Sequence, residues 1–558
     1  MTHRMFEQPL LAISLGLLAT CWLASDAEAR RERLDLQHTS IDLPGSPATI
    51  LTPDLDGDGL RDLVVLVVYT EWDQLAVEET TEMDDIEGLI EVMTIVPALA
   101  DRRELHVFLG VAAGGYRAVP HLELDRGLLA LEDGPPAAPV VALTDAGLSA
   151  LRLDGEQLSF EPLFEDPPVL AGSGTFVPRL GLGRHLDDDG RLDLIFPARD
   201  GAVVHLADAE GYRPATSRLA LPTDRRQAGR RLIRHYPLPE VRDVDGDRQL
   251  DLVFRDDEED QLAFFVLGNL SSGRFSRPIG PLTLPPPCPE SDPECPSADE
   301  ELVYFGDIDG DGRAEYVSQQ GLEEDDAGFR QEMREAKRPP YRYRLYRSDE
   351  RLAPATEPYQ TFDALGYTFE NSEADEGQGN VSIPGGFHDL DGDGRQDLLA
   401  LTLDFSIMQV MRIMTLKQIS IGLDFHVYCQ QPDGDFQQVQ GLDLSGRFKV
   451  DINDLKVHQL SFFDGDFDGD GKADFVQLGR GRNVTIHRGR EGCRYASNPD
   501  LTLRLKEEPR NVALVRIDDL DADGFSDLLI VQPNRVKEPG VTPPVRLELY
   551  RSQQAVGR

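Results

Sequence analysis

The clearest chemistry in this chain lies in acidic side chains at alternate positions of a short stretch. Asp389, Asp391, Asp393 and Asp397 stand at positions one, three, five and nine, and Gly394 is the sixth residue. Carboxylates at this spacing can fold back around one hard cation that takes about six to eight oxygen ligands, and the backbone carbonyl at position seven can add another. The stretch therefore predicts a calcium-binding loop.

The same nine-residue pattern returns six more times along the chain. In one copy His185 stands where the first Asp is expected. Self-similarity over tens of residues indicates a repeat fold in which each copy is one supersecondary unit. We expect about six to seven bound Ca²⁺ ions, held by these residues, with the position-seven carbonyl named in five copies: Asp54, Asp56, Asp58, Leu60, Asp62; Asp187, Asp189, Asp193; Asp243, Asp245, Asp247, Asp251; Asp307, Asp309, Asp311, Arg313, Glu315; Asp389, Asp391, Asp393, Arg395, Asp397; Asp466, Asp468, Asp470, Lys472, Asp474; Asp519, Asp521, Asp523, Phe525 and Asp527.

The residues after each loop exclude an EF-hand. An EF-hand loop carries a bidentate Glu at position twelve and lies between helices. Here position twelve is never acidic, and a short apolar run follows position nine, as in Leu63 to Val68 and Leu398 to Leu401. Runs of this length and composition are typical of buried strands. Each loop is therefore expected to lead into a β-strand.

Further strand signals between the loops give four strands in each repeat. One strand precedes the loop, one follows it, and a third run such as Glu104 to Leu109 comes next. A Gly turn followed by an aromatic residue, as at Gly115-Tyr116, Gly211-Tyr212, Gly273-Arg-Phe275 and Gly434-Asp-Phe436, is expected to open the fourth. Four-stranded units arranged radially are the blades of a β-propeller. The predicted fold class is all-β.

Loop spacing predicts eight four-stranded blades, with seven as the alternative. The first two loops lie about twice as far apart as the others, and residues 139–163 between them read as strands without a metal loop. The N-terminal segment 33–44 is expected to pair with the last blade and close the ring, which would hide two open sheet edges. The predicted organisation is a signal peptide at 1–29 and one propeller domain at 30–558, with blades at about 45–128, 129–168, 175–222, 230–285, 300–362, 378–447, 457–505 and 510–552.

Three insertions interrupt the blade pattern, each between a second and a third strand. Residues 70–103, 319–340 and 404–422 contain apolar or charged residues at helical spacing. In an antiparallel blade these connections leave from the face opposite the first-to-second connections. We therefore expect short helical insertions on one face of the propeller and the metal loops on the other.

The N-terminus has the layout of a secretory signal. Basic residues precede the apolar stretch Leu10 to Ala24, and Ala27-Glu28-Ala29 follows as a small-residue cleavage site. The expected location is secreted, periplasmic or at the cell surface, with a lipoprotein anchored through Cys21 as the less favoured alternative. The apolar stretch is short for a membrane span of about 20 residues, so no transmembrane anchor is expected after cleavage.

The number of cysteines and the net charge indicate the cellular compartment and the classes of partner. Cleavage leaves Cys288, Cys295, Cys429 and Cys493. An even number of cysteines in an exported chain favours disulfides. The expected pairs are Cys288–Cys295 and Cys429–Cys493, and four free thiols are the alternative. The net charge is −44, and 27 of the 100 acidic residues lie in the loops. Because phosphate backbones demand basic patches, no nucleic-acid partner is expected.

The loops resemble the FG-GAP/VCBS-type calcium-binding β-propeller repeats known from integrin α-subunit heads and many exported bacterial proteins. The resemblance is carried best by Phe305-Gly306-Asp-Ile-Asp-Gly-Asp-Gly312 and by Phe463 to Gly471, and it covers about residues 34 to 552. It implies that the matching Asp residues are calcium ligands. His185, Arg248 at a position-six Gly and Ala522 at a position-four Gly depart from the pattern, and loop two is expected to bind weakly or not at all.

Two classes of function fit these features. The first is an exported scaffold that binds carbohydrate or protein, or acts in adhesion, with a ligand on the insertion face and structural calcium. The alternative is a polysaccharide lyase or hydrolase, since the family resemblance includes such enzymes and glycosidases need two carboxylates about 5 to 10 Å apart. Because the sequence contains no HExxH site, GxSxG elbow or P-loop, we expect that the chain is not an enzyme.

Overall fold

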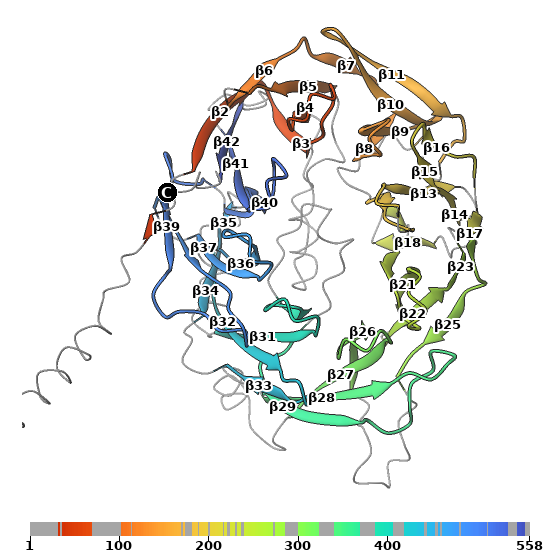
Figure 1. Cartoon of the computed structure of the whole chain (residues 1–558), viewed down its shortest axis with the longest axis vertical. Coiled ribbons are helices and arrows are strands. Elements are labelled where there is room, and N and C mark those ends of the chain that lie inside the picture. The colour runs from red at the N-terminus through yellow and green to blue at the C-terminus, as the bar shows by residue number, and fades with distance from the viewer. Residues whose placement is uncertain are drawn as a thin grey trace, which may run out of the picture.

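The computed structural model is an all-β ring of small antiparallel sheets, an eight-bladed β-propeller (Figure 1). The predicted fold class and the count of eight are confirmed, and the seven-blade alternative is wrong. The structure describes residues 32–33, 36–69, 102–112, 114–168, 171–172, 181–187, 189–198, 201–215, 217–219, 224–228, 231–235, 239–259, 261–271, 274–284, 300–322, 340–368, 385–404, 418–439, 444–451, 456–457, 460–478, 481–510, 512–533 and 544–552.

The first four blades follow one another from β3 to β25. Blade one is β3 (Ser46–Leu51), β4 (Leu63–Tyr69), β5 (Arg102–Gly110) and β6 (Tyr116–Ala118), with β7 (Leu122–Leu124) also paired to β5. Blade two is β8 (Leu128–Asp133), β9 (Val140–Thr144), β10 (Gly147–Asp154) and β11 (Gln157–Phe164). Blade three is β12 (Gly183–Arg184), β13 (Asp193–Ala198), β14 (Gly201–His205) and β17 (Ser217–Leu219). Blade four is β20 (Glu240–Arg242), β21 (Asp251–Glu259), β22 (Gln261–Leu267) and β25 (Ile279–Leu282).

The remaining four blades complete the ring. Blade five is β26 (Glu301–Gly306), β27 (Glu315–Gly321), β28 (Pro340–Arg347) and β29 (Gln360–Leu365). Blade six is β30 (Gly386–His388), β31 (Asp397–Asp404), β32 (Gln418–Gln430), β34 (Ser445–Asp451) and β35 (Lys456–Val457), with β33 (Phe436–Gln438) on β32. Blade seven is β36 (Leu460–Gly465), β37 (Asp474–Leu478), β38 (Asn483–His487) and β39 (Leu501–Arg504). Blade eight is β40 (Val515–Asp518), β41 (Asp527–Pro533), β42 (Val545–Arg551) and β2 (Gln37–Leu43).

The apolar run after each loop is continuous because the second strand of a blade is buried on both faces. In β4, Val64, Leu66 and Val68 pack toward blade two, whereas Leu63 and Val65 pack toward blade eight. Every pair of neighbouring blades shares an apolar cluster of this kind among the described residues. The core of this protein is therefore a set of seams between blades, and each blade depends on its neighbours for burial.

The first and last described segments of the chain meet at blades seven and eight. β2 pairs with β42 in antiparallel register from Gln37↔Arg551 to Leu43↔Val545, so the N-terminal part supplies the outer strand of the last blade. Figure 1 shows β2 beside β42. In addition, β1 (Glu32–Arg33) pairs in parallel with β39 of blade seven. This contact was not predicted, because two residues with no periodic pattern carry no strand signal.

Two predictions about the blades are not confirmed: the position of two strands is wrong, and the helical insertions lie mostly outside the described residues. The strands opened by Gly211 and Gly273 are not the outer strands of their blades but form small hairpins, β15–β16 (Ala207–Asp208, Gly211–Tyr212) and β23–β24 (Asn269–Ser271, Arg274–Phe275), because β17 and β25 take the outer positions. The expected helical insertions lie almost wholly outside the described residues. Within the described part, no helix is long and apolar enough to cross a membrane.

Candidate metal centres in the blade loops

Each acidic loop connects the first strand of a blade to the second, so all seven lie on one face of the ring. The carboxylate at position one closes the loop locally. In blade one, Asp54 accepts the backbone N–H groups of Gly57 at 2.8 Å and Gly59 at 3.0 Å. The same two-point contact recurs in blades four, five, six and seven. These bonds hold the turn so that positions three and five face position one.

Several loops bring three carboxylates close together, which is what a metal site requires and what the sequence predicts. In blade one, oxygens of Asp54, Asp56 and Asp58 lie within 4.8 Å of one another, and Asp307, Asp309 and Asp311 do the same in blade five. In blade four the group is Asp243, Asp245 and Asp251. Such convergence of like charges is unfavourable unless a cation or a proton compensates it.

Buried oxygens without a partner give a direct test of whether a cation fits. The position-three carboxylates Asp391, Asp468 and Asp521 each bury Oδ1 without any hydrogen-bond partner. A buried polar atom left unpaired is costly, so this recurrence at one loop position calls for a missing partner. The oxygen-only donor set suits a hard divalent cation. The residues present therefore fit such an ion in blades six, seven and eight.

The position-nine carboxylate fastens the loop to the sheet. Asp62 is 1% exposed and accepts the N–H groups of Leu55 and Gly110, each at 2.8 Å. Leu55 lies inside the loop, whereas Gly110 ends the third strand of the blade. The equivalent Asp in blades three, four, six, seven and eight makes the same pair of contacts. Position nine thus serves as a buried structural anchor, whatever further role it has toward an ion.

Burial changes the proton affinity of these anchors. Desolvation raises the pKa of Asp397, Asp474 and Asp527 to about 7, although their backbone hydrogen bonds act in the opposite direction. Burial likewise raises the pKa of Asp251 to about 6 and that of Glu315 to about 8. Nearby loop carboxylates add to each shift. A cation in the loop would oppose these effects by stabilising the charged form.

The incomplete loop of blade three has a distinctive internal contact. His185 Nδ1 donates to the backbone carbonyl of Arg191 at 2.9 Å. Arg191 holds position seven, whose carbonyl is a metal ligand in the calcium-loop pattern. Its guanidinium also pairs with Asp189 at 2.7 Å. The imidazole therefore occupies the acceptor that an ion would need, which supports the expectation of weak binding at this loop.

An arginine opposite the loop was missed by the sequence reasoning. In blade five, Arg347 is the strand partner of Glu315 and lies 3.0 Å from Asp309 and 3.2 Å from Asp311. Arg488 holds the same register in blade seven, 3.0 Å from Asp468. Arg551 holds it in blade eight. The signal was present as the repeated sequence Leu-Tyr-Arg-Ser at 345–348 and 549–552.

Two loops place ordinary residues where the pattern has glycine. Arg248 has φ of 68° and Ala522 has φ of 59°, both in the left-handed region. The equivalent glycines at 59 and 392 have φ of 86° and 75°. Because a side chain disfavours this conformation, these loops carry backbone strain that the others avoid.

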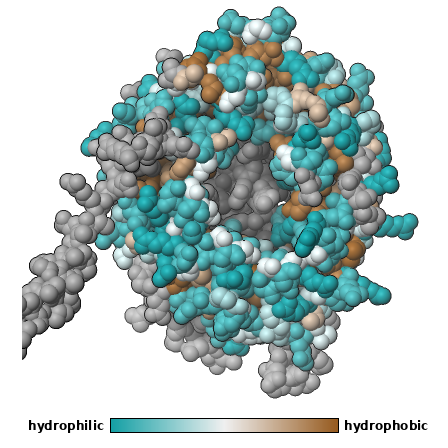
Figure 2. All heavy atoms as spheres, viewed as in Figure 1, coloured by the Kyte–Doolittle hydropathy of each residue, from teal (hydrophilic) through white to brown (hydrophobic). Residues whose placement is uncertain are grey.

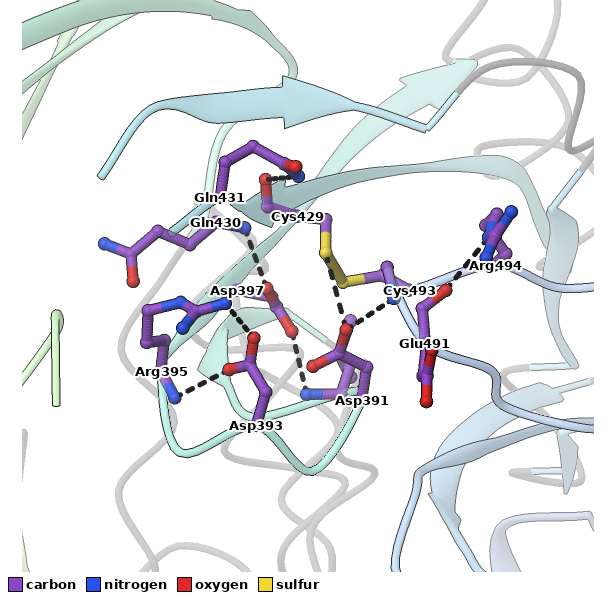
Figure 3. The surroundings of a disulfide bond; sticks show 12 residues. Asp391, Asp393, Arg395, Asp397, Cys429, Gln430, Gln431, Glu491, Cys493 and Arg494 are labelled. Carbon is purple, nitrogen blue, oxygen red and sulfur yellow. Dashed lines mark hydrogen bonds and ion pairs between the residues drawn. A yellow bond between two sulfur atoms is a disulfide. The ribbon is translucent and has the colours of Figure 1, made fainter. Parts of the chain in front are cut away.

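A disulfide joins the loop faces of blades six and seven. Cys429 at the end of β32 is bonded to Cys493, with a Cα–Cα distance of 5.7 Å (Figure 3). This expected pairing is confirmed, whereas Cys288 and Cys295 lie outside the described residues. The backbone N–H of Gly492, next to the disulfide, donates to Asp391 at 2.6 Å. The covalent link is thus coupled to a loop carboxylate.

A cavity of about 580 Å³ lies beside this disulfide, between the two loops. Gln430 lines it and is 2% exposed, yet neither Nε2 nor Oε1 has a hydrogen-bond partner. Arg395 and Lys472 also line the cavity, where Arg395 pairs with Asp393 and Lys472 lies 2.8 Å from Asp470.

On the face drawn in Figure 2, hydrophilic residues predominate among those coloured.

Comparisons with known proteins add little beyond the fold. No protein-family model matches the chain, and no curated protein matches it. Among solved structures, the chain is similar to a family 117 glycoside hydrolase produced by the marine bacterium Zobellia galactanivorans, with 10% sequence identity, a TM-score of 0.20, and coverage of 56% of this chain and 83% of that chain. The prediction that the chain is not an enzyme is withdrawn as a correction, because it rested only on missing motifs and missing motifs exclude no activity. The likeness is too weak to assign an activity or a catalytic residue to this chain.

Proposed function

We propose that this protein is an exported β-propeller whose acidic blade loops bind Ca²⁺, and that the loaded ring is a scaffold for binding or adhesion to carbohydrate or protein. The observation that carries the calcium part is the unpaired, buried Oδ1 of Asp391, Asp468 and Asp521, which recurs at one loop position in three blades. A loop of this kind gives an oxygen cage for a hard cation.

Calcium has a structural role in this proposal. Each loop links the first two strands of a blade, and in every loop-bearing blade except blade five the position-nine carboxylate also accepts a backbone N–H at or just after the end of the third strand. An ion would remove the repulsion between clustered carboxylates at the point where three strands meet. Similar loops spread around a ring cannot serve a single reaction centre, so the ions are expected to stabilise the fold.

The disulfide supports export. Cys429–Cys493 joins neighbouring blades, and bonds of this kind persist in oxidising compartments outside the cytosol. Extracellular fluids also supply calcium at concentrations that loops with micromolar to millimolar affinity can use.

The cavity between blades six and seven is where we place a ligand. The unpaired amide of Gln430 can donate and accept at once, which suits vicinal hydroxyl groups. Calcium bound to Asp393 and Asp470 would release Arg395 and Lys472 from those carboxylates, so that both cations could meet an acidic group. These features fit a carbohydrate that carries carboxylates. The predicted ligand face opposite the loops consists of insertions that lie outside the described residues.

Two measurements test the proposal. Melting of the full chain in calcium and in excess EGTA should show a loss of many degrees on chelation, because ligand binding to the folded state alone stabilises it. Asp393→Asn should reduce the calcium-dependent gain, while Asp154→Asn, in a turn of the loop-free blade two, should not. An unchanged melting curve in EGTA would contradict the calcium part.

A screen of acidic and neutral glycans, with and without calcium, tests the scaffold part. Binding should require calcium and should be lost in Gln430→Leu, with Gln157→Leu on the exposed side of β11 as the matched control. If glycan binding survives in Gln430→Leu, the ligand does not occupy this cavity.

A further inference from the structure

Blade one carries a second group of metal-ligating side chains that differs in chemistry from the acidic loops. Glu104 in β5, Glu123 in β7 and His121 directly before β7 each place one ligand atom within 4.8 Å of the others. The loops offer oxygen atoms, whereas this group combines an imidazole nitrogen with two carboxylates. It also lies outside the nine-residue pattern, which is why the sequence reasoning did not find it.

The sheet itself brings these residues together. β5 and β7 are antiparallel, and Glu104 is the direct strand partner of Glu123. Side chains two residues apart on a strand share a face, so His106 and His121 follow on the same side. Their rings stack with centroids 5.3 Å apart. The group is therefore set by strand register rather than by the conformation of an exposed loop.

Glu104 is held in place by two contacts on one of its oxygens, Oε2. It is 6% exposed, and it accepts a hydrogen bond from the Tyr69 hydroxyl at 2.6 Å. His106 Nε2 lies 3.1 Å from the same oxygen. Metal ligands that are fixed by such outer partners bind more tightly, because their orientation is set before the ion arrives.

Arg102 does not block this group. Its guanidinium lies 3.1 Å from Glu104 Oε1, but the side chain is 59% exposed and also covers the Tyr69 ring at 3.9 Å. It can keep the contact with the aromatic ring while an ion takes the carboxylate. The exposed His121 and Glu123 leave a path to solvent for the ion.

We propose that Glu104, His121 and Glu123 form a binding site for a divalent transition-metal ion such as Zn²⁺. Mixed imidazole and carboxylate ligands suit Zn²⁺ and its neighbours, whereas Ca²⁺ prefers oxygen alone. Three protein ligands also leave a coordination position for water or a ligand oxygen. The proposal is independent of the calcium loops.

Cobalt titration of the full chain in saturating calcium tests this site. Co²⁺ reports its own coordination through visible absorption, and calcium keeps the acidic loops occupied. We expect one Co²⁺ per chain, displaced by Zn²⁺, with an affinity that falls at least about tenfold in His121→Asn and in Glu123→Gln. Glu156→Gln, which changes another exposed glutamate of the neighbouring blade two, is the control and should bind as the unchanged chain does.

Two outcomes would overturn the proposal. One is that the unchanged chain takes up no Co²⁺ or Zn²⁺ in the presence of calcium. The other is that both variants bind Co²⁺ as tightly as the control does. Because His121 and Glu123 are exposed, both variants should fold, and their melting temperatures check this directly. If the loops do not bind calcium, the Co²⁺ affinities of the variants and of the control can still be compared, because all three chains carry the same loops.

Discussion

The loops of blades one and five share their acidic pattern but face different residues from the third strand. In blade five, Arg347 reaches Asp309 and Asp311 and lies 3.6 Å from Glu315. In blade one the same place in the strand register belongs to Leu109, which is 2% exposed and packs in the seam toward blade two. Blade five thus places an arginine of its third strand against the loop carboxylates, whereas blade one has an apolar side chain at that place.

This difference separates two ways to stabilise an acidic turn in one ring. The Arg347 side chain is half exposed, so solvent screens its attraction for the carboxylates. It can reduce repulsion in the calcium-free chain while it lowers the net charge available to a cation. We infer that the blade-one loop depends more on calcium than the blade-five loop does. Blades seven and eight, with Arg488 and Arg551, should resemble blade five.

The largest effect is expected when the anchors are removed. Asp62→Ala deprives two backbone N–H groups of their partners and should lower the free energy of unfolding by about 3 kcal/mol. Glu315→Ala should cost less, because Ile308 is the backbone donor to that carboxylate in the described structure. Chemical denaturation of both variants without calcium checks the order. Equal losses would remove the distinction between the two loops.

Removing the arginine tests the comparison itself. Arg347→Leu should raise the calcium affinity of one loop by about tenfold, since a positive charge about 4 Å away at a half-exposed site is worth on the order of 1 to 2 kcal/mol. Isothermal titration should show the change at a single site.

Arg342→Leu is the matched control, because Arg342 lies on the same strand but pairs with Asp363 at 2.8 Å. In EGTA, Arg347→Leu should melt below this control. If calcium affinity does not change, Arg347 has no part in the charge balance of the loop.

The pH dependence should differ with and without calcium. Burial raises the pKa of Asp397, Asp474 and Asp527 from an ordinary 3.8 to about 7, so their contribution to stability is full below about pH 4. That contribution is lost as the pH rises through about 7, and calcium should offset the loss by binding the charged form. The gap between melting temperatures in calcium and in EGTA should therefore widen from pH 5 to pH 8.

Asp397→Asn provides the control for this pH effect. It removes one titrating anchor, so its melting temperature in EGTA should fall less steeply with pH than that of the unchanged chain. A gap that narrows toward pH 8 would show that the buried carboxylates are not coupled to the ion.

The smallest effect concerns the strained backbone positions. Arg248→Gly and Ala522→Gly should each stabilise the calcium-free chain by about 0.5 to 1 kcal/mol, because glycine accepts a positive φ without steric cost. Only Arg248→Gly also removes a charge, so it alone should strengthen calcium binding. Thermal melts and titrations of both variants separate backbone strain from charge. If Ala522→Gly lowers the stability of the calcium-free chain, the inference that Ala522 is strained is wrong.

Most of the fold could be predicted from the sequence because the motif repeats. Continuous apolar runs after each loop mark strands that are buried on both faces, and the loop-free blade two was readable from its turns at 144–147 and 154–155. Hairpins such as β15–β16 were misassigned, because a Gly-aromatic turn does not specify which strand it pairs with. The strand register in the structure shows that these residues pair with each other in a hairpin.

The site was predictable only in its local part. Positions one to nine come from adjacent residues, so spacing alone predicts their convergence. Arg347, 32 residues after Glu315, reaches the loop only through the pairing of β27 with β28. Likewise, Glu104 and Glu123 meet only because β7 returns to β5. Contacts of this kind depend on strand register, which the residue pattern did not give.

The most direct test of the central claim is the calcium content of the folded chain at equilibrium, measured by dialysis and elemental analysis. Six complete loops predict about six Ca²⁺ per chain, with the loop at His185 largely empty, and one fewer in Asp391→Asn. A folded chain that binds no calcium, or whose calcium content is unaffected by substitution of loop carboxylates, would contradict the account.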